Sequence, residues 1–266
     1  MIIVGGVEIK QDHFPDGTLL TKFNPNSDEF DSRGSMLVEW YYENDAELFT
    51  LICVKRHLDR VYSYNDVILY MPYIPHARQD RVKSDEDVFT LKYFCEVINS
   101  LKFKIVHVRD AHSNVSLALL DNVRDDGIAH YIHKAIDASG VDVLFFPDEG
   151  AMKRYSSTSE KPYAFGLKKR DWETGQIQGL DIVNAEVVVG KNVLIVDDIC
   201  SRGGTFFYSA KALKEAGAKK VYLYVTHAEN TIIKGEMYNT DGLVEKIYTT
   251  DSLFYAEDFL NKIKIF

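Results

Sequence analysis

Short apolar runs alternate with stretches of helical periodicity along most of the chain. Runs typical of buried parallel strands occur at residues 67–71, 105–108, 141–146, 193–196 and 221–225. Apolar residues spaced three or four apart, which predict amphipathic helices, occur at 47–59, 88–101, 127–139 and 206–216. Further strands are predicted at 1–4, 37–42, 163–167, 186–189 and 247–251, with 186–189 as the return strand of a hairpin that starts at 163–167. This alternation predicts an α/β protein.

The pattern starts afresh in the second half of the chain, after a predicted boundary near residues 120–126. We therefore predict two doubly wound parallel-sheet domains, residues 1–123 and 124–266. Polar motifs follow several of the predicted strands, and ligands of open α/β sheets bind at the carboxyl ends of strands. We expect the active site to lie between the domains.

The most informative stretch is VLIVDDICSRGGT, residues 193–205. An apolar strand is followed by Asp197 and Asp198, and then by a loop with two glycines that leads into a predicted helix. A glycine loop at a helix start offers backbone N–H groups to an anion, typically a phosphate. Carboxylates suit hydroxyl groups or Mg²⁺. The combination indicates a sugar phosphate, and a solvated turn between strand and helix is the alternative.

A second polar segment, PYIPHARQDR at residues 72–81, follows the apolar run 67–71. It places Arg78 and Arg81 beside an amide and a carboxylate. Arginine side chains suit bidentate contacts with phosphate. An exposed charged loop is the alternative for this segment.

Composition limits the classes of partner. The net charge of −9 argues against general binding of nucleic acid or of anionic membranes. The three cysteines have no spacing typical of metal ligands. We expect no signal peptide, and the sequence contains no apolar run of membrane-spanning length. We expect a cytoplasmic protein with reduced thiols and no nucleic-acid or membrane partner.

Several motifs in order resemble those of ribose-phosphate pyrophosphokinases (PRPP synthetases), and they span most of the chain: Phe14–Gly17, residues 77–81, Asp110 with His112, residues 147–150 and residues 197–205. The last motif also resembles type I phosphoribosyltransferases, which lack the ATP-contacting segment that residues 72–81 resemble. The resemblance implies that the β,γ-diphosphate of ATP moves to the anomeric hydroxyl of ribose 5-phosphate and that AMP is released.

The resemblance also implies a role for each candidate site residue. ATP would be bound by Phe14, Asp16, Arg78, Gln79 and Arg81; Mg²⁺ by His112 and Asp148; the ribose hydroxyls by Asp197 and Asp198; and the 5-phosphate by Ser201, Arg202, Gly203, Gly204 and Thr205. The catalytic residues would be Lys168, Arg170 and His112, with the two cations neutralising the transferred group. A homo-oligomer, a dimer or larger, is also expected.

Arg202 departs from the motif, because the family usually has threonine at this position of the phosphate loop. A guanidinium there could reach a second phosphate, and the acceptor could then be a 5-substituted ribose such as ADP-ribose. The alternative is that Arg202 points to solvent. Two other functions remain open: a phosphoribosyltransferase that uses PRPP, and a catalytically silent regulatory paralogue of PRPP synthetase.

Overall fold

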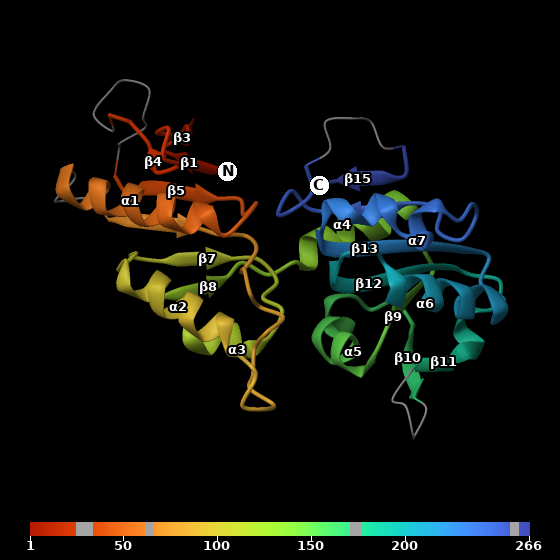
Figure 1. Cartoon of the computed structure of the whole chain (residues 1–266). Coiled ribbons are helices and arrows are strands. Elements are labelled where there is room, and N and C mark those ends of the chain that lie inside the picture. Colours follow the sequence, from red (N-terminus) through yellow and green to blue (C-terminus); the bar gives the residue numbers. More distant parts are fainter. Residues whose placement is uncertain (25–33, 62–65, 171–176, 256–260) are drawn as a thin grey trace. The chain divides into compact units, whose positions relative to one another are not determined.

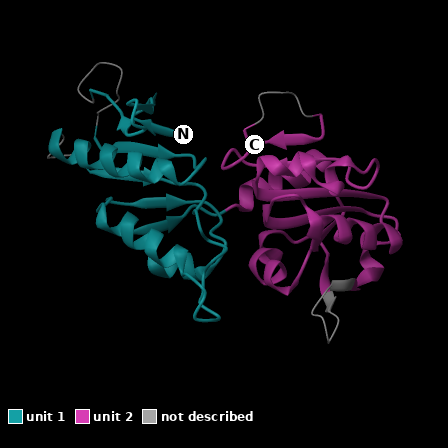
Figure 2. Cartoon of the chain, in the orientation of Figure 1, with its two compact units in different colours: residues 1–127 teal, residues 128–266 magenta. Residues whose placement is uncertain are grey.

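The computed structural model describes residues 1–24, 34–61, 66–170, 177–255 and 261–266, without the side chains of 168–170 and 177–179. The chain divides into two compact units, Met1–Gly127 (unit 1) and Ile128–Phe266 (unit 2), shown in Figure 2. Each unit is built on one main sheet with helices, which confirms the α/β class. The division falls after Gly127 instead of after residue 123, because β8 (Val123–Asp125) pairs with β7 (Val106–Val108) of unit 1.

The sheet of unit 1 has the strand order β2-β1-β5-β6-β7-β8 (Figure 1). Strands β5 to β8 are parallel, and β1 is antiparallel to β2 and β5. A small hairpin of β3 and β4 stands apart from this sheet. The remaining bounds are β1 Ile2–Val4, β2 Val7–Glu8, β3 Asp12–His13, β4 Leu19–Leu20, β5 Met36–Trp40, β6 Val67–Tyr70, α1 Ala46–Val61, α2 Thr90–Ser100 and α3 Asn114–Leu119.

Helices α1 and α2 cover one face of this sheet, because both are amphipathic. Leu51 of α1 and Phe94 of α2 belong to the same buried cluster as Val38, Leu69 and Val106, which are register partners on the neighbouring strands β5, β6 and β7. Since β6 and β7 are adjacent and parallel, the segments that follow them leave the sheet side by side. These two segments carry Arg78, Gln79 and Arg81 of the predicted ATP residues, and the predicted metal ligand His112.

The sheet of unit 2 has the order β11-β10-β9-β12-β13-β14-β15 and is parallel except for the β10–β11 pair (Figure 1). Its strands are β9 Val143–Phe146, β10 Tyr163–Arg170, β11 Ile177–Val183, β12 Asn192–Cys200, β13 Lys220–Ala228, β14 Ile247–Thr249 and β15 Ile263–Ile265. Its helices are α4 Ala129–Ser139, α5 Glu149–Tyr155, α6 Gly204–Glu215 and α7 Glu236–Asn239, with 3₁₀ turns at Ser156–Thr158 (η1), Ala185–Val188 (η2) and Asn230–Lys234 (η3).

Both faces of the second sheet are covered, as a doubly wound fold requires. Phe206 of α6 packs with Phe145 and Ile195 in one cluster. Tyr155 of α5 packs with Phe146 in a separate cluster, on alternate residues of the same strands. The chain leaves β9 toward β10 on one side and continues from β12 toward β13 on the other. The carboxyl ends of β9 and β12 therefore flank a topological switch point, where such folds bind ligands.

The predicted return strand at 186–189 is wrong. The strand that pairs with β10 is β11, and residues Ala185–Val188 form the 3₁₀ turn η2. Asn184 ends the strand with a left-handed backbone (φ 61°). Of the valines that suggested a strand, Val188 is buried and Val189 is 60% exposed. The predicted strand is therefore a turn whose last residue, Val188, is anchored in the core.

No helix in the described ranges is long and apolar enough to span a membrane.

Candidate functional site

The loop between β12 and α6 has the geometry of an anion-binding site. Gly203 precedes the helix in a left-handed conformation (φ 76°), which glycine adopts without strain. The first N–H groups of a helix have no partner within it, and they lie at the positive end of the helix dipole. Arg202 and Thr205 are exposed beside these groups. All five predicted 5-phosphate residues therefore lie at the start of one helix, where a phosphate can bind.

Asp197 and Asp198 lie within β12 and not in the loop after it. The strand extends beyond its apolar run because residues up to Cys200 remain paired with β13. The backbone N–H of Asp198 donates to Oδ1 of Asp197 at 3.0 Å. Burial raises the pKa of Asp197 well above its usual range, and the Asp198 and Asp148 carboxylates add to this effect. The two aspartates form an acidic pair whose charges repel each other.

Arg154 of α5 supplies a cation to this acidic pair. Its Nη1 donates to Oδ2 of Asp198 at 3.3 Å and to the hydroxyl of Tyr155 at 3.0 Å. The guanidinium carbon lies 5.5 Å from the centre of the Tyr155 ring. The Asp198 side chain is 7% exposed, and that of Arg154 is 31% exposed. Arg154 therefore compensates a buried carboxylate at the switch point while remaining accessible to solvent.

The turn after β9 places Asp148 beside the acidic pair. Asp148 is the N-cap residue of α5, and its Oδ1 accepts a hydrogen bond from the N–H of Ala151 at 3.1 Å. The turn packs directly on β10, since a Cβ on Gly166 would lie 2.6 Å from the carbonyl oxygen of Pro147. Because β9 and β12 are adjacent, the Asp148 carboxylate is close enough to act on the pKa of Asp197. The structure thus brings together the predicted metal ligand and ribose-binding residues of unit 2.

The segment after β6 in unit 1 is organised around Asp80. Arg81 Nε donates to Oδ1 of Asp80 at 2.8 Å and Nη2 donates to Oδ2 at 3.3 Å. These hydrogen bonds lower the pKa of Asp80, and Ser113 and His112 act in the same direction. Asp80 therefore links this segment to the one that follows β7. Arg81 itself stays 67% exposed, so its fork is oriented by Asp80 and open to solvent.

Gln79 and Arg78, the other predicted ATP residues of this segment, are both exposed. The side-chain oxygen of Gln79 accepts a hydrogen bond from the hydroxyl of Thr90, at the start of α2, at 2.7 Å. Gln79 is thereby fixed at its carbonyl end, and its amide nitrogen remains a donor for a ligand.

The loop after β7 carries His112 and is held by Asp125 of β8. The N–H groups of Asp110 and Ala111 donate to the two oxygens of Asp125 at 3.1 and 3.3 Å. Asp110 has a left-handed backbone (φ 50°), so the sharp turn depends on these contacts. The N–H of Arg109 also donates to the carbonyl of Pro72 in the neighbouring segment at 3.1 Å. His112 is half-buried at the end of this braced loop.

The predicted ATP residues Phe14 and Asp16 lie on the turn of the β3–β4 hairpin. Oδ1 of Asp16 accepts hydrogen bonds from the backbone N–H of Thr18 at 3.0 Å and from its hydroxyl at 2.7 Å. These bonds lower the pKa of Asp16. Phe14 is 50% exposed at the turn. The turn therefore presents an accessible aromatic ring, and its fixed carboxylate closes the turn.

Lys168 and Arg170 belong to β10, and their side chains lie outside the described part of the chain. Their catalytic role therefore stays a prediction. Among the described residues, no group of three or more His, Cys, Asp or Glu side chains is arranged to hold a metal ion. The assignment of Mg²⁺ to His112 of unit 1 and Asp148 of unit 2 also stays a prediction.

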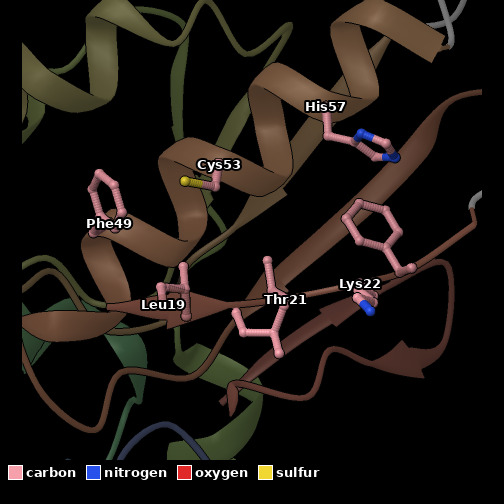
Figure 3. A pocket seen from close by; sticks show the side chains of 8 residues that line it. Leu19, Thr21, Lys22, Phe49, Cys53 and His57 are labelled. Carbon is pink, nitrogen blue, oxygen red and sulfur yellow. The ribbon is translucent and has the colours of Figure 1, made fainter. Parts of the chain in front are cut away.

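Unit 1 also contains a cavity of about 480 Å³ between α1 and residues 19–23 (Figure 3). Phe49, Cys53 and His57 of α1 form one wall. Phe23 meets the His57 ring edge-on, with the ring centres 4.9 Å apart. None of the predicted ATP-binding residues lines this cavity, so it is separate from the candidate site.

Known proteins resemble this chain over both units. A protein of Thermosipho africanus named ribose-phosphate pyrophosphokinase is 30% identical over 225 residues, which is 80% of this chain and 68% of that protein. The chain belongs to the ribose-phosphate pyrophosphokinase family. The protein of the same name from Thermococcus kodakarensis is 28% identical over 255 residues, covering 93% of this chain and 85% of that protein.

Membership of this family confirms the predicted family and the prediction of an enzyme. A family model described as a phosphoribosyl transferase domain matches residues 127–248, which fall almost entirely within unit 2. The crystal structure of phosphoribosylpyrophosphate synthetase from Mycobacterium smegmatis is 20% identical to this chain, with a TM-score of 0.78 over 97% of this chain and 85% of that one. At this identity the likeness shows the fold of a ribose-phosphate pyrophosphokinase.

Two residues that support the site of this family member were missed by the sequence predictions. Arg154 lies on α5, and its partner Asp198 is 44 residues away along the chain. Asp125 lies in what the sequence indicated as a domain boundary, and it supports a loop 15 residues earlier. No local pattern in the sequence marks either contact.

Proposed function

We propose that the chain transfers the β,γ-diphosphate of ATP to the 1-hydroxyl of a ribose 5-phosphate or of a 5-substituted ribose such as ADP-ribose. The products are the ribose 1-diphosphate and AMP. The observation that carries the proposal is that relatives named ribose-phosphate pyrophosphokinase align with 93% of the chain, across both units. A phosphoribosyltransferase that uses PRPP needs no ATP-binding segment, and the phosphoribosyl transferase model covers residues 127–248 alone.

Unit 2 holds the acceptor in this proposal. The N–H groups at the start of α6, together with Ser201 and Thr205, bind the 5-phosphate. Asp197 and Asp198 accept hydrogen bonds from the ribose hydroxyls, and Arg154 holds the Asp198 side chain in place through its hydrogen bond. The 1-hydroxyl is then oriented by contacts at the other side of the ribose, which is how positioning lowers the barrier of a two-substrate reaction.

Unit 1 holds ATP. The forked cations Arg78 and Arg81 bind phosphate oxygens, Gln79 donates through its amide nitrogen, and the Phe14 ring offers a stacking surface for adenine. Asp80 orients Arg81 before ATP arrives, because it accepts two hydrogen bonds from the guanidinium. Arg81 binds phosphate through the N–H groups that Asp80 does not engage, and a guanidinium that is already oriented loses less entropy when it binds.

In the chemical step, the 1-hydroxyl oxygen attacks the β-phosphorus, the bond from this phosphorus to the α,β-bridging oxygen breaks, and the hydroxyl proton passes to solvent water. AMP leaves with the bridging oxygen. Lys168 and Arg170 neutralise the negative charge on the transferred diphosphate. The protein contributes alignment and charge stabilisation, because phosphoryl transfer requires little covalent work from side chains.

The carboxylates of unit 2 fit a magnesium ion. Mg²⁺ prefers oxygen ligands and is commonly held by one or two carboxylates together with substrate phosphates. The raised pKa of Asp197 reflects burial and repulsion from Asp198 and Asp148, and a divalent cation relieves such repulsion. Asp148 and His112 would hold the ion, which when bound neutralises phosphate charge.

The nature of the acceptor depends on Arg202. Its side chain is exposed at the start of α6, and a guanidinium there can bind a second phosphate beyond the 5-phosphate. We therefore include ADP-ribose as an acceptor alongside ribose 5-phosphate.

The test is to incubate the full chain with Mg-ATP and either ribose 5-phosphate or ADP-ribose, and to separate AMP from ADP by chromatography. Acceptor-dependent AMP is expected, and the more efficient acceptor is identified by kcat/KM. An Arg202→Thr variant should lose activity with ADP-ribose selectively if Arg202 binds the second phosphate. ADP as the product would indicate transfer of a single phosphoryl group, and an absence of AMP with both acceptors would refute the proposed activity.

A further inference from the structure

The phosphate loop, residues 201–205 from the end of β12 to the start of α6, packs against residues 230–239. These residues follow β13 and include η3 and α7. Gly235 of this segment is buried against the backbone of Arg202. A Cβ on Gly235 would lie 1.8 Å from the Arg202 carbonyl oxygen and 2.7 Å from its carbonyl carbon. Gly235 has a φ of −87°, which any residue can adopt. Glycine is therefore required here by a close contact and not by the backbone conformation.

A second contact supports the next residue of the loop. Met237 is fully buried, and a Cβ on Gly203 would lie 3.0 Å from its Cε atom. Gly203 is the residue whose left-handed backbone turns the loop into α6. Two successive residues of the phosphate loop thus lie against residues 235 and 237.

The supporting segment is itself held in shape. Nδ2 of Asn239 donates to the carbonyl oxygens of Ile233 and Gly235 at 3.0 and 2.8 Å. The N–H of Gly235 donates to the carbonyl of Ile232 at 3.1 Å, and Ile232 is fully buried. Further upstream, the N–H of Glu229 donates to the carbonyl of Cys200 at 2.8 Å, where β12 enters the loop.

We propose that residues 230–239 are a positioning element that sets the backbone of the phosphate loop, with Gly235 as its key contact. In this view, which rests on the function proposed above, Gly235 controls affinity for the phosphorylated acceptor without touching it. It fixes the carbonyl of Arg202, and so fixes the direction of the Arg202 side chain and of the N–H groups that follow. Binding of ATP does not depend on this contact.

A Gly235→Ala variant tests the contact directly. To restore an ordinary van der Waals distance of 3.4 Å, the Ala Cβ and the Arg202 oxygen would have to part by about 1.6 Å. A displacement of about 1 Å in a binding site can reduce activity roughly a hundredfold. We expect the KM for ribose 5-phosphate to rise at least about tenfold, while the KM for ATP stays within about twofold.

An Asn239→Ala variant loosens the same segment without a clash, because Asn239 is exposed and only its two hydrogen bonds are lost. It keeps the test valid if Gly235→Ala fails to fold. The matched control is Gly140→Ala at the end of α4, where the left-handed backbone (φ 61°) makes alanine unfavourable but a Cβ meets nothing within 4 Å. This variant lowers the free energy of unfolding through a residue outside the phosphate loop.

The second readout is hydrogen–deuterium exchange at residues 207–210 of the full chain, the first amides of α6 that have partners in the helix, such as the N–H of Phe207 with the carbonyl of Gly203 at 2.8 Å; it needs no activity. We expect faster exchange there in Gly235→Ala and Asn239→Ala than in the wild type and Gly140→Ala. Unchanged exchange in both test variants, or equal rises in the KM for ATP and for ribose 5-phosphate, would overturn the positioning role. A wild-type chain that forms no AMP would refute the proposed function instead, and the exchange measurement would still decide the role of the segment.

Discussion

The pairing of Arg154 with Asp198 predicts a measurable loss of stability when the cation is removed. In Arg154→Met, Asp198 keeps its buried carboxylate but loses a guanidinium nitrogen 3.3 Å away. At this distance the Coulomb attraction is about 5 kcal/mol for an effective dielectric constant of about 20. Desolvation of both groups offsets most of this attraction, and a hydrogen bond to a charged group contributes about 1.5–3 kcal/mol net. Because 31% of the Arg154 side chain is exposed, we expect the free energy of unfolding to fall by an amount near the lower end of this range, about 1.5–2 kcal/mol.

The free energy of unfolding is measured by urea denaturation at pH 7 without divalent cations. Lys153→Met is the matched control, since Lys153 is on the same helix and its 3.3 Å ion pair with Glu149 has side chains that are 68% and 60% exposed. Such an exposed pair contributes less than about 1 kcal/mol. If Arg154→Met were no less stable than Lys153→Met, Arg154 would not compensate the acidic pair as inferred.

Two further predictions concern carboxylates. Because the pKa of Asp197 is raised in the folded chain, its charge destabilises the fold above that pKa. Asp197→Asn should therefore be more stable than the wild type at pH 7, by about 1.4 kcal/mol for each unit of the shift. In urea denaturation without metal, this gain should vanish as the pH falls toward 4. A variant with no gain at pH 7 would contradict the burial of charge inferred for Asp197. Asp125→Ala leaves two buried N–H groups of the His112 loop without their acceptor. It should lose about 1–3 kcal/mol of stability in urea denaturation and raise the KM for ATP in AMP-release kinetics. If the stability and the KM both equalled the wild-type values, the loop would not depend on Asp125.

Much of the fold follows from the apolar runs, because buried parallel strands must be apolar on both faces. The run 193–196 correctly indicated β12, but the strand continues through Asp197 and Asp198 to Cys200 because pairing with β13 outweighs the polarity of these residues. The valines near 188 suggested a strand that is not there. An apolar run is no proof of a strand, because an anchored turn can also bury one valine.

The candidate site could be predicted only where its residues follow one another in the chain. The phosphate loop is such a case, because its glycines and the following helix are contiguous. Arg154 and Gly235 act on residues that are distant in the sequence, and their contacts arise from the order of strands in the sheet. Residue type alone does not distinguish these side chains from an exposed helix arginine or a loop glycine.

In the proposed reaction, a diphosphate is taken intact from ATP and reaches the 1-position of a ribose. Phosphorus-31 NMR of the full chain with Mg-ATP and ribose 5-phosphate, and separately with ADP-ribose, follows this transfer without any coupled assay. We expect the ATP signals to be replaced by those of AMP and of a sugar-linked diphosphate in equal amounts, with at least one of the two acceptors. Persistence of ATP with both acceptors, or its conversion to ADP, would refute transfer of an intact diphosphate.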